Sequence, residues 1–180
     1  MNDPSFLLAA IDEVTAELLR QRGGPVHVAD EFPGYPCRQC LDDARIGEEL
    51  ILVSHDPFSR KTEYRSASPI LLHRTPCTPS TRLELGALPV QLTRRQLSVR
   101  SFDRYETMID AAVIDGASLE ATINTFFENP RSCSIHVHNA SRGCWAVSVV
   151  RRHRFRPDVL VPTGPPSPTA RSGSAVDRWH

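Results

Sequence analysis

The sequence predicts an α+β protein, with a mainly antiparallel sheet of hairpins, an N-terminal helix and one further helix. Apolar segments with strand periodicity follow one another at hairpin spacing, without the strand–helix–strand alternation that is typical of parallel sheets. Helical periodicity occurs in two places only. The length of 180 residues fits one domain, which we expect over residues 1–155. Residues 156–180 are rich in Pro, Ser and Arg, a composition that predicts a disordered tail.

The two predicted helices have recognisable ends. The first is expected over residues 4–21, because Asp3 is a suitable N-cap, Pro4 suits the first turn and Gly23-Gly24 follows. Its apolar face should consist of residues at spacings of four, three and four, namely Leu7, Ile11, Val14 and Leu18. The second helix should run from a cap at Ser118 to Glu128.

Seven segments are predicted as strands. The apolar run from Glu49 to Ser54 should be buried on both faces, and it is expected to pair with Pro69–His73. The remaining segments are a short strand and two expected hairpins: Val26–Val28, Gln96–Phe102 with Thr107–Ile114, and Cys133–Asn139 with Cys144–Arg151.

The composition narrows the functional classes. Lys+Arg and Asp+Glu are both 21, so the formal net charge is zero, which argues against a protein built mainly to bind nucleic acid. The sequence has neither a secretory signal pattern nor a membrane-spanning apolar run, so we expect a cytoplasmic protein without membrane contact. Thiols stay reduced there, so the five cysteines do not indicate a disulfide framework. Metal binding, redox chemistry and core packing remain open for them.

Cys37, Cys40, His73 and Cys77 form the first candidate site. The Cys-x2-Cys spacing supplies two zinc ligands from one tight turn, and zinc prefers four thiolate or imidazole ligands in a tetrahedron. If the two strands around residues 49–54 and 69–73 form a hairpin, its open end brings Cys40 close to His73. A closed site of this kind would be structural. The alternative is that these cysteines only pack in the core.

Thiol–disulfide chemistry is a second interpretation of Cys37-x-x-Cys40, in which Arg38 would help to lower the pKa of the first thiol. However, redox pairs usually follow a strand directly in a βαβ unit, and no such unit is predicted here.

His136 and His138 form the third candidate, with Cys144 as a further metal ligand. Residues two apart on a strand point to the same side of the sheet, so both imidazoles share one face. A four-residue turn would place His138 opposite Trp145 and His136 opposite Val147. The alternative is that two hydrogen-bonded histidines lie in a central hairpin without binding anything.

A basic cluster follows the last predicted strand. It could contact phosphates, but with zero net charge a solvated strand end is favoured, or ion pairs with acidic groups such as Asp42 and Asp43. Its members are Arg151, Arg152, His153, Arg154 and Arg156.

Several segments resemble, in the same order over about residues 25–152, a bacterial family labelled domain of unknown function 1203. They are Phe32–Arg38, Gly47-Glu48, Leu97–Asp103, Ile135–Ala140 and Gly143-Cys144. The family label assigns no activity, so the resemblance implies no reaction. In the family pattern Cys37 and Cys144 match better than Cys40 and Cys77. The resemblance therefore implies that the four-ligand site is particular to this chain or absent, and it draws attention to Cys37 with His136, His138 and Cys144.

Three functional hypotheses follow. The first is a small binding or structural module that contains a metal, with zinc as the expected ion. The second is a metal- or thiol-dependent enzyme that uses the His136/His138 pair with Cys37 or Cys144. The third and weakest is a nucleic-acid accessory protein that uses the basic cluster.

Overall fold

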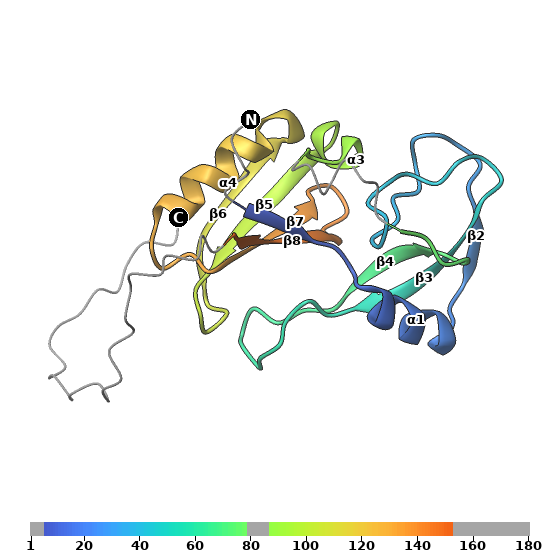
Figure 1. Cartoon of the computed structure of the whole chain (residues 1–180), viewed down its shortest axis with the longest axis horizontal. Coiled ribbons are helices and arrows are strands. Elements are labelled where there is room, and N and C mark those ends of the chain that lie inside the picture. The colour runs from blue at the N-terminus through green and yellow to red at the C-terminus, as the bar shows by residue number, and fades with distance from the viewer. Residues whose placement is uncertain (1–5, 79–86, 153–180) are drawn as a thin grey trace, which may run out of the picture.

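The larger sheet of the protein has five strands, all antiparallel to their neighbours, in the order β1-β8-β7-β5-β6. The computed structural model describes residues 6–78 and 87–152, and Figure 1 shows the arrangement. The strands of this sheet are β1 (Phe6–Ala9), β5 (Gln96–Phe102), β6 (Met108–Asp115), β7 (Ser134–Asn139) and β8 (Trp145–Arg151).

A second, three-stranded antiparallel sheet has the order β2-β3-β4. Its strands are β2 (Val26–Val28), β3 (Glu49–His55) and β4 (Ser68–His73). Leu50, Ile51 and Val53 of β3 are all buried, as expected for its apolar run. The two antiparallel sheets, together with the helices, confirm the predicted α+β class. The antiparallel strands form two sheets, whereas one was predicted.

The helices in the described part of the chain are α1 (Glu13–Arg22), the short α3 (Val90–Thr93) and α4 (Leu119–Glu128), which follows a 3-10 turn (Gly116–Ser118). Helix α4 packs on one face of the large sheet, because its Leu119 and Ile123 share an apolar core with Ile135 and Val137 of β7. None of these helices is long and apolar enough to cross a membrane.

The predicted N-terminal helix is wrong in its first half. Residues 6–9 form strand β1, which pairs with β8 so that Phe6 lies opposite Arg151, and the helix begins only at Glu13. Asp12 caps it, since its carboxylate accepts a hydrogen bond of 2.9 Å from the Thr15 amide. The helix does end at Gly23, which has a φ of 71° that favours glycine.

The predicted apolar face of this helix is also wrong. Val14 is 71% exposed and Leu18 is 52% exposed, whereas α1 buries Ala16 and Leu19. The periodicity ran across two elements, and pairing with β8 overrode the helical pattern in the first of them. The predicted cap at Asp3 lies outside the described residues, as does the expected tail over 156–180.

The two predicted hairpins of the large sheet are confirmed. His138 lies opposite Trp145 as expected. His136 lies opposite Ser148, whereas Val147 was predicted, because the register shifts between Val137 and His138. An irregularity of this kind adds a residue to one strand and displaces every later pair by one.

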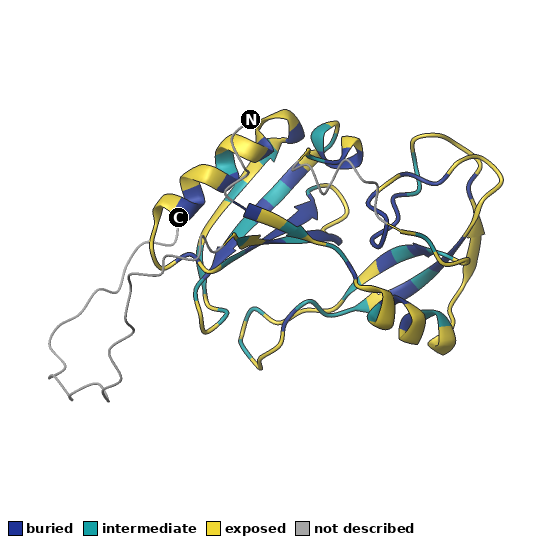
Figure 2. Ribbon diagram, in the orientation of Figure 1, coloured by how far each residue is buried: buried dark blue, intermediate teal, exposed yellow. Residues whose placement is uncertain are grey.

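The two sheets meet where β4 lies close to β8. The Trp145 amide donates a hydrogen bond of 3.0 Å to the Ser68 hydroxyl, and Trp145 belongs to the same buried cluster as Leu19 of α1 and Leu72 of β4. Figure 2 shows buried residues along the inner strands of both sheets and mostly exposed residues on α1. The cysteine-containing segment between β2 and β3 lies against this junction, since Cys37 belongs to that cluster too.

Candidate metal centre

A tight loop holds the first cysteine pair. Pro36 and Asp43 form an antiparallel bridge that closes the loop, and the Cys37 amide donates to the Asp42 carbonyl at 2.9 Å. The next amide, that of Arg38, donates to the Leu71 carbonyl of β4 at 3.0 Å. The loop is therefore attached to the edge of the three-stranded sheet, and both cysteines are held beside β4.

The β3–β4 hairpin supplies the second half of the site. His73 is the last residue of β4 and pairs with Leu50 at the start of β3, so it lies at the open end of the hairpin. The prediction that this end brings Cys40 and His73 together is confirmed, with 3.6 Å between the Cys40 Sγ and the His73 Nδ1. Cys77 follows four residues later and lies 3.7 Å from Cys37, measured between the two Sγ atoms.

All four potential ligand atoms lie within 4.8 Å of one another. Cys37 and Cys40 are buried, while His73 and Cys77 are partly buried. The amide of His73 also donates to the Cys37 Sγ at 3.5 Å. The four side chains come from three separate segments of the chain, and together they form a group that could hold a metal ion.

Three neighbouring side chains position this cluster. The Nε2 of His73 lies 3.2 Å from a carboxylate oxygen of Glu48, which leaves Nδ1 directed at the sulfurs. Arg20 of α1 donates to the His73 carbonyl at 2.9 Å and also to the side-chain oxygen of Gln39, which in turn accepts a hydrogen bond from the Cys77 thiol. A carboxylate behind a ligating histidine fixes its tautomer and ring orientation in many metal sites.

Arg20 and Glu48 were not predicted as part of the site. Arg20 reaches it through the packing of α1 on the small sheet, for which the sequence has no local signal. Glu48 could have been found from the expected hairpin. It directly precedes β3, and the pairing of β3 with β4 places it beside the end of β4.

The protonation of the cluster reflects the closeness of the sulfurs. Hydrogen bonds from Cys40 and Cys77 hold the pKa of the Cys37 thiol well below its ordinary value. The hydrogen bond to Cys37 raises the pKa of Cys40 and raises that of Cys77 to about 11. Contact with the Cys37 sulfur, and then with Cys40, raises the pKa of His73 to about 10. Cys37 is thus the thiol of the cluster that loses its proton most readily, and a divalent cation would replace the protons of the cluster.

The second interpretation of the cysteine pair does not fit this geometry. Cys37 lies in a loop and not at a helix N-terminus, and it is completely buried. The guanidinium of Arg38 donates to the carbonyls of Trp145 and Pro36 and to the sulfur of Cys144. Hydrogen bonds with Cys40 and Cys77, and not Arg38, are the main causes of the lowered pKa of Cys37.

His136 and His138 share one face of β7, as expected, with ring centroids 6.3 Å apart. His136 packs against the rings of Phe58 and Phe102, with centroid distances of 4.8 and 4.7 Å. His138 donates from Nδ1 to the Gly143 carbonyl at 3.0 Å. Among the described residues, the Nδ1 of His136 and the Nε2 of His138 are buried without a hydrogen-bond partner.

The structure does not group these histidines with Cys144. Within the described residues, the cluster around Cys37 is the only set of three or more potential ligands close enough to share an ion. Burial lowers the pKa of both His136 and His138 to about 4, so both imidazoles are neutral near neutral pH. Each imidazole therefore has one buried nitrogen without a hydrogen-bond partner among the described residues, and His136 packs against aromatic rings.

The basic cluster is only partly described. Arg151 donates to the carbonyls of Ser132 and Asn129 at 3.0 and 2.8 Å and lies over the ring of Phe127, so it ties β8 to the end of α4. Residues 153–156 lie outside the described part. The expected pairing with acidic groups does not include Asp43, which binds two other arginines.

The fold and site define a small α+β protein with a Cys3His cluster at the open end of a β-hairpin. Comparison with known families gives a match over residues 34–151 to the family described as protein of unknown function (DUF1203), and the chain belongs to this family. The matched region contains all four residues of the cluster as well as His136, His138 and Cys144. No curated protein and no solved structure matches the chain.

Proposed function

We propose that Cys37, Cys40, His73 and Cys77 bind one zinc ion, and that the protein is a small binding or structural module built around this centre. The supporting observation is the spacing of the ligand atoms. Zn–S bonds of about 2.3 Å and Zn–N bonds of about 2.1 Å in a tetrahedron require roughly 3.8 Å between two sulfurs and roughly 3.6 Å between sulfur and nitrogen. The Sγ atoms of Cys37 and Cys77 are 3.7 Å apart, the Cys40 Sγ lies 3.6 Å from the His73 Nδ1, and all four ligand atoms lie within 4.8 Å of one another.

The donor set favours zinc over magnesium and calcium. Three thiols and one imidazole suit zinc, whereas magnesium and calcium prefer oxygen ligands. A Zn²⁺ ion with three thiolates and a neutral imidazole carries one net negative charge, and the Arg20 guanidinium lies against Gln39 of the same loop. Glu48 is placed to accept the proton on the Nε2 of His73.

The proposed role is structural. Four protein ligands fill a tetrahedral zinc site and leave no open position for substrate. The ion would connect the loop before β3 with the end of β4 and the segment that follows it, which lie more than 30 residues further along the chain. Binding at such a site contributes directly to folding, because the ligands are not assembled in the unfolded chain.

Zinc content per chain tests the proposal. Protein would be purified without a His-tag or chelator and measured by elemental mass spectrometry, with Cys40→Ser as the test variant and Cys133→Ser as the matched control, since Cys133 is exposed and outside the cluster. We expect close to one zinc per chain in the wild type and control, and a large loss in Cys40→Ser.

Cobalt(II) binding gives a second readout that does not depend on the stability of a variant. Cobalt bound by three thiolates and a histidine should show intense tetrahedral visible bands and a sulfur-to-metal charge-transfer band. Wild-type protein without metal, or zinc that is retained in Cys40→Ser and lost in His136→Ala, would overturn the assignment.

A further inference from the structure

A second feature of the molecule, separate from the cysteine cluster, is a cavity of about 370 Å³ where the two sheets meet. Leu52 of β3 and Leu71 of β4 line it from the small sheet, and Gln96 of β5 and Asn139 of β7 line it from the large sheet. Its volume lies within the range of small-molecule sites, which is roughly 300–1,000 Å³.

The charge of this cavity is one-sided. Three arginines line it, Arg38, Arg95 and Arg142, and no Asp or Glu of the described residues does. Arg95 is paired with the buried carboxylate of Asp43, with 2.7 Å between the two groups, and shares this carboxylate with Arg94. Within the described part of the chain, neither Arg38 nor Arg142 has a carboxylate at ion-pair distance.

Arg38 is a buried cation, with only 2% of the residue exposed. Its Nε donates to the Trp145 carbonyl at 2.7 Å and its Nη1 to the Pro36 carbonyl at 2.6 Å. Its Nη2 donates to the Cys144 Sγ at 3.3 Å. These contacts satisfy hydrogen bonds but supply no carboxylate, and the Cys144 and Cys37 sulfurs provide the opposing charge near Arg38. Because three arginines and no carboxylate of the described residues line the cavity, its wall favours an anion.

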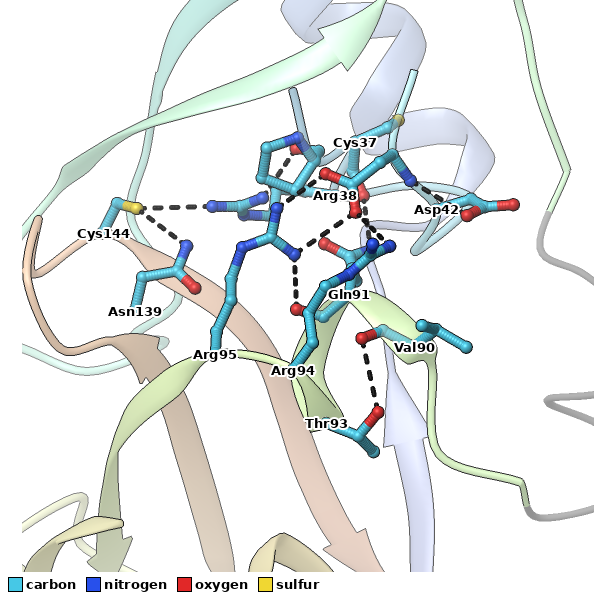
Figure 3. Close-up of polar contacts among 12 residues, drawn as sticks. Cys37, Arg38, Asp42, Val90, Gln91, Thr93, Arg94, Arg95, Asn139 and Cys144 are labelled. Carbon is cyan, nitrogen blue, oxygen red and sulfur yellow. Dashed lines mark hydrogen bonds and ion pairs between the residues drawn. The ribbon is translucent and has the colours of Figure 1, made fainter. Parts of the chain in front are cut away.

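Cys144 lies at the point where these groups converge. Its sulfur accepts hydrogen bonds from Arg38 and from the Nδ2 of Asn139, each at 3.3 Å, and Figure 3 shows the two side chains directed at it. The thiol also lines the cavity. Two donors on one sulfur hold it in a fixed position on the wall, beside the charge that would attract an anion.

We infer that this cavity is a binding site for a small organic anion, with Cys144 as a thiol that contacts the bound molecule. A carboxylate or phosphate group would be held by Arg38 and by Arg142 at the exposed rim. The apolar part of the ligand would lie against Leu52 and Leu71. None of the residues that define this site is a proposed zinc ligand, although Arg38 lies in the same loop as Cys37 and Cys40.

Alkylation of the native protein with two matched reagents tests this site. Iodoacetate is anionic and iodoacetamide is its neutral counterpart. Both react by the same step, in which the cysteine sulfur forms a bond to the CH₂ carbon, iodide leaves and the thiol proton passes to buffer. Peptide mass spectrometry measures both rates at Cys144 and, as an internal reference, at the exposed Cys133. The urea-unfolded chain gives the intrinsic ratio for Cys144.

We expect the iodoacetate-to-iodoacetamide rate ratio at native Cys144 to exceed both references by about tenfold or more, since clefts of one charge raise local concentrations of the opposite ion by that order. Arg142→Gln should lower this ratio. Arg104→Gln is the matched control. Gln96 lines the cavity at the start of β5, whereas Arg104 follows the other end of this strand, roughly 20 Å from Gln96. Equal ratios at Cys144 and its references, or a Cys144 that reacts with neither reagent, would overturn the inference.

Discussion

The two buried histidines of β7 make the stability of this protein depend on pH. Burial is the main reason why the pKa of His136 lies at about 4, and the nearby His138 adds to it. Burial also lowers the pKa of His138 to about 4. In the unfolded chain both groups have the ordinary value of about 6.5. As the pH falls below about 6.5, the unfolded state therefore takes up protons before the folded state does, and stability is lost.

The size of the effect follows from these values. At about pH 5.5 an unfolded histidine is roughly 90% protonated, while one with a pKa of about 4 is almost entirely neutral. This difference in protonation lowers the free energy of unfolding by between about 1 and 2 kcal/mol for each histidine, or by about 3 kcal/mol for the pair. The full contribution is present above about pH 6.5 and is lost progressively as the pH falls toward 4.

Urea unfolding at about pH 7.5 and about pH 5.5 measures this difference. The test compares the wild type with His136→Leu, which replaces the imidazole by an apolar side chain that can pack against Phe58 and Phe102. Effects of the cysteine cluster are common to both proteins and cancel. We expect the drop in unfolding free energy between the two pH values to be smaller by about 1–2 kcal/mol in the variant.

His27→Gln serves as the control, because it removes an imidazole from the exposed strand β2. The drop in unfolding free energy of His27→Gln between the two pH values should equal that of the wild type. If His136→Leu shows the same drop as the wild type, the reasoning is refuted, since burial of His136 would then carry no proton-linked cost.

Three further substitutions test other parts of the fold. Asp43→Asn removes the buried carboxylate shared by Arg94 and Arg95 and should cost about 2–3 kcal/mol in urea unfolding, below the value for fully buried pairs because both guanidiniums are partly exposed. Asp12→Ala removes the cap of α1 and should cost about 1 kcal/mol by the same assay. Gly116→Ala would place a Cβ 2.0 Å from a backbone oxygen and should lower the thermal midpoint markedly, with a loss of about 2–3 kcal/mol; an unchanged midpoint would contradict the close packing of this turn.

The sequence by itself determined the class of the fold and most of its strands. Strand periodicity placed β3, β4 and the two hairpins of the large sheet, because alternating or continuous apolar runs are local properties of the chain. The Cys-x2-Cys pair and the expected hairpin were enough to predict that Cys40 and His73 lie side by side.

The tertiary structure decided features that depend on distant partners. Residues 6–9 have helical periodicity but form β1, because they pair with β8 at the other end of the chain. The shift at Val137 and His138 and the division into two sheets likewise have no local signal.

The surroundings of the two sites were also decided by the tertiary structure. Arg20 reaches the cysteine cluster only through the packing of α1. Arg38 meets Cys144 across 106 residues of chain. Such contacts join segments that are remote in sequence, and their energies depend on burial and geometry, which arise only when the two sheets pack together.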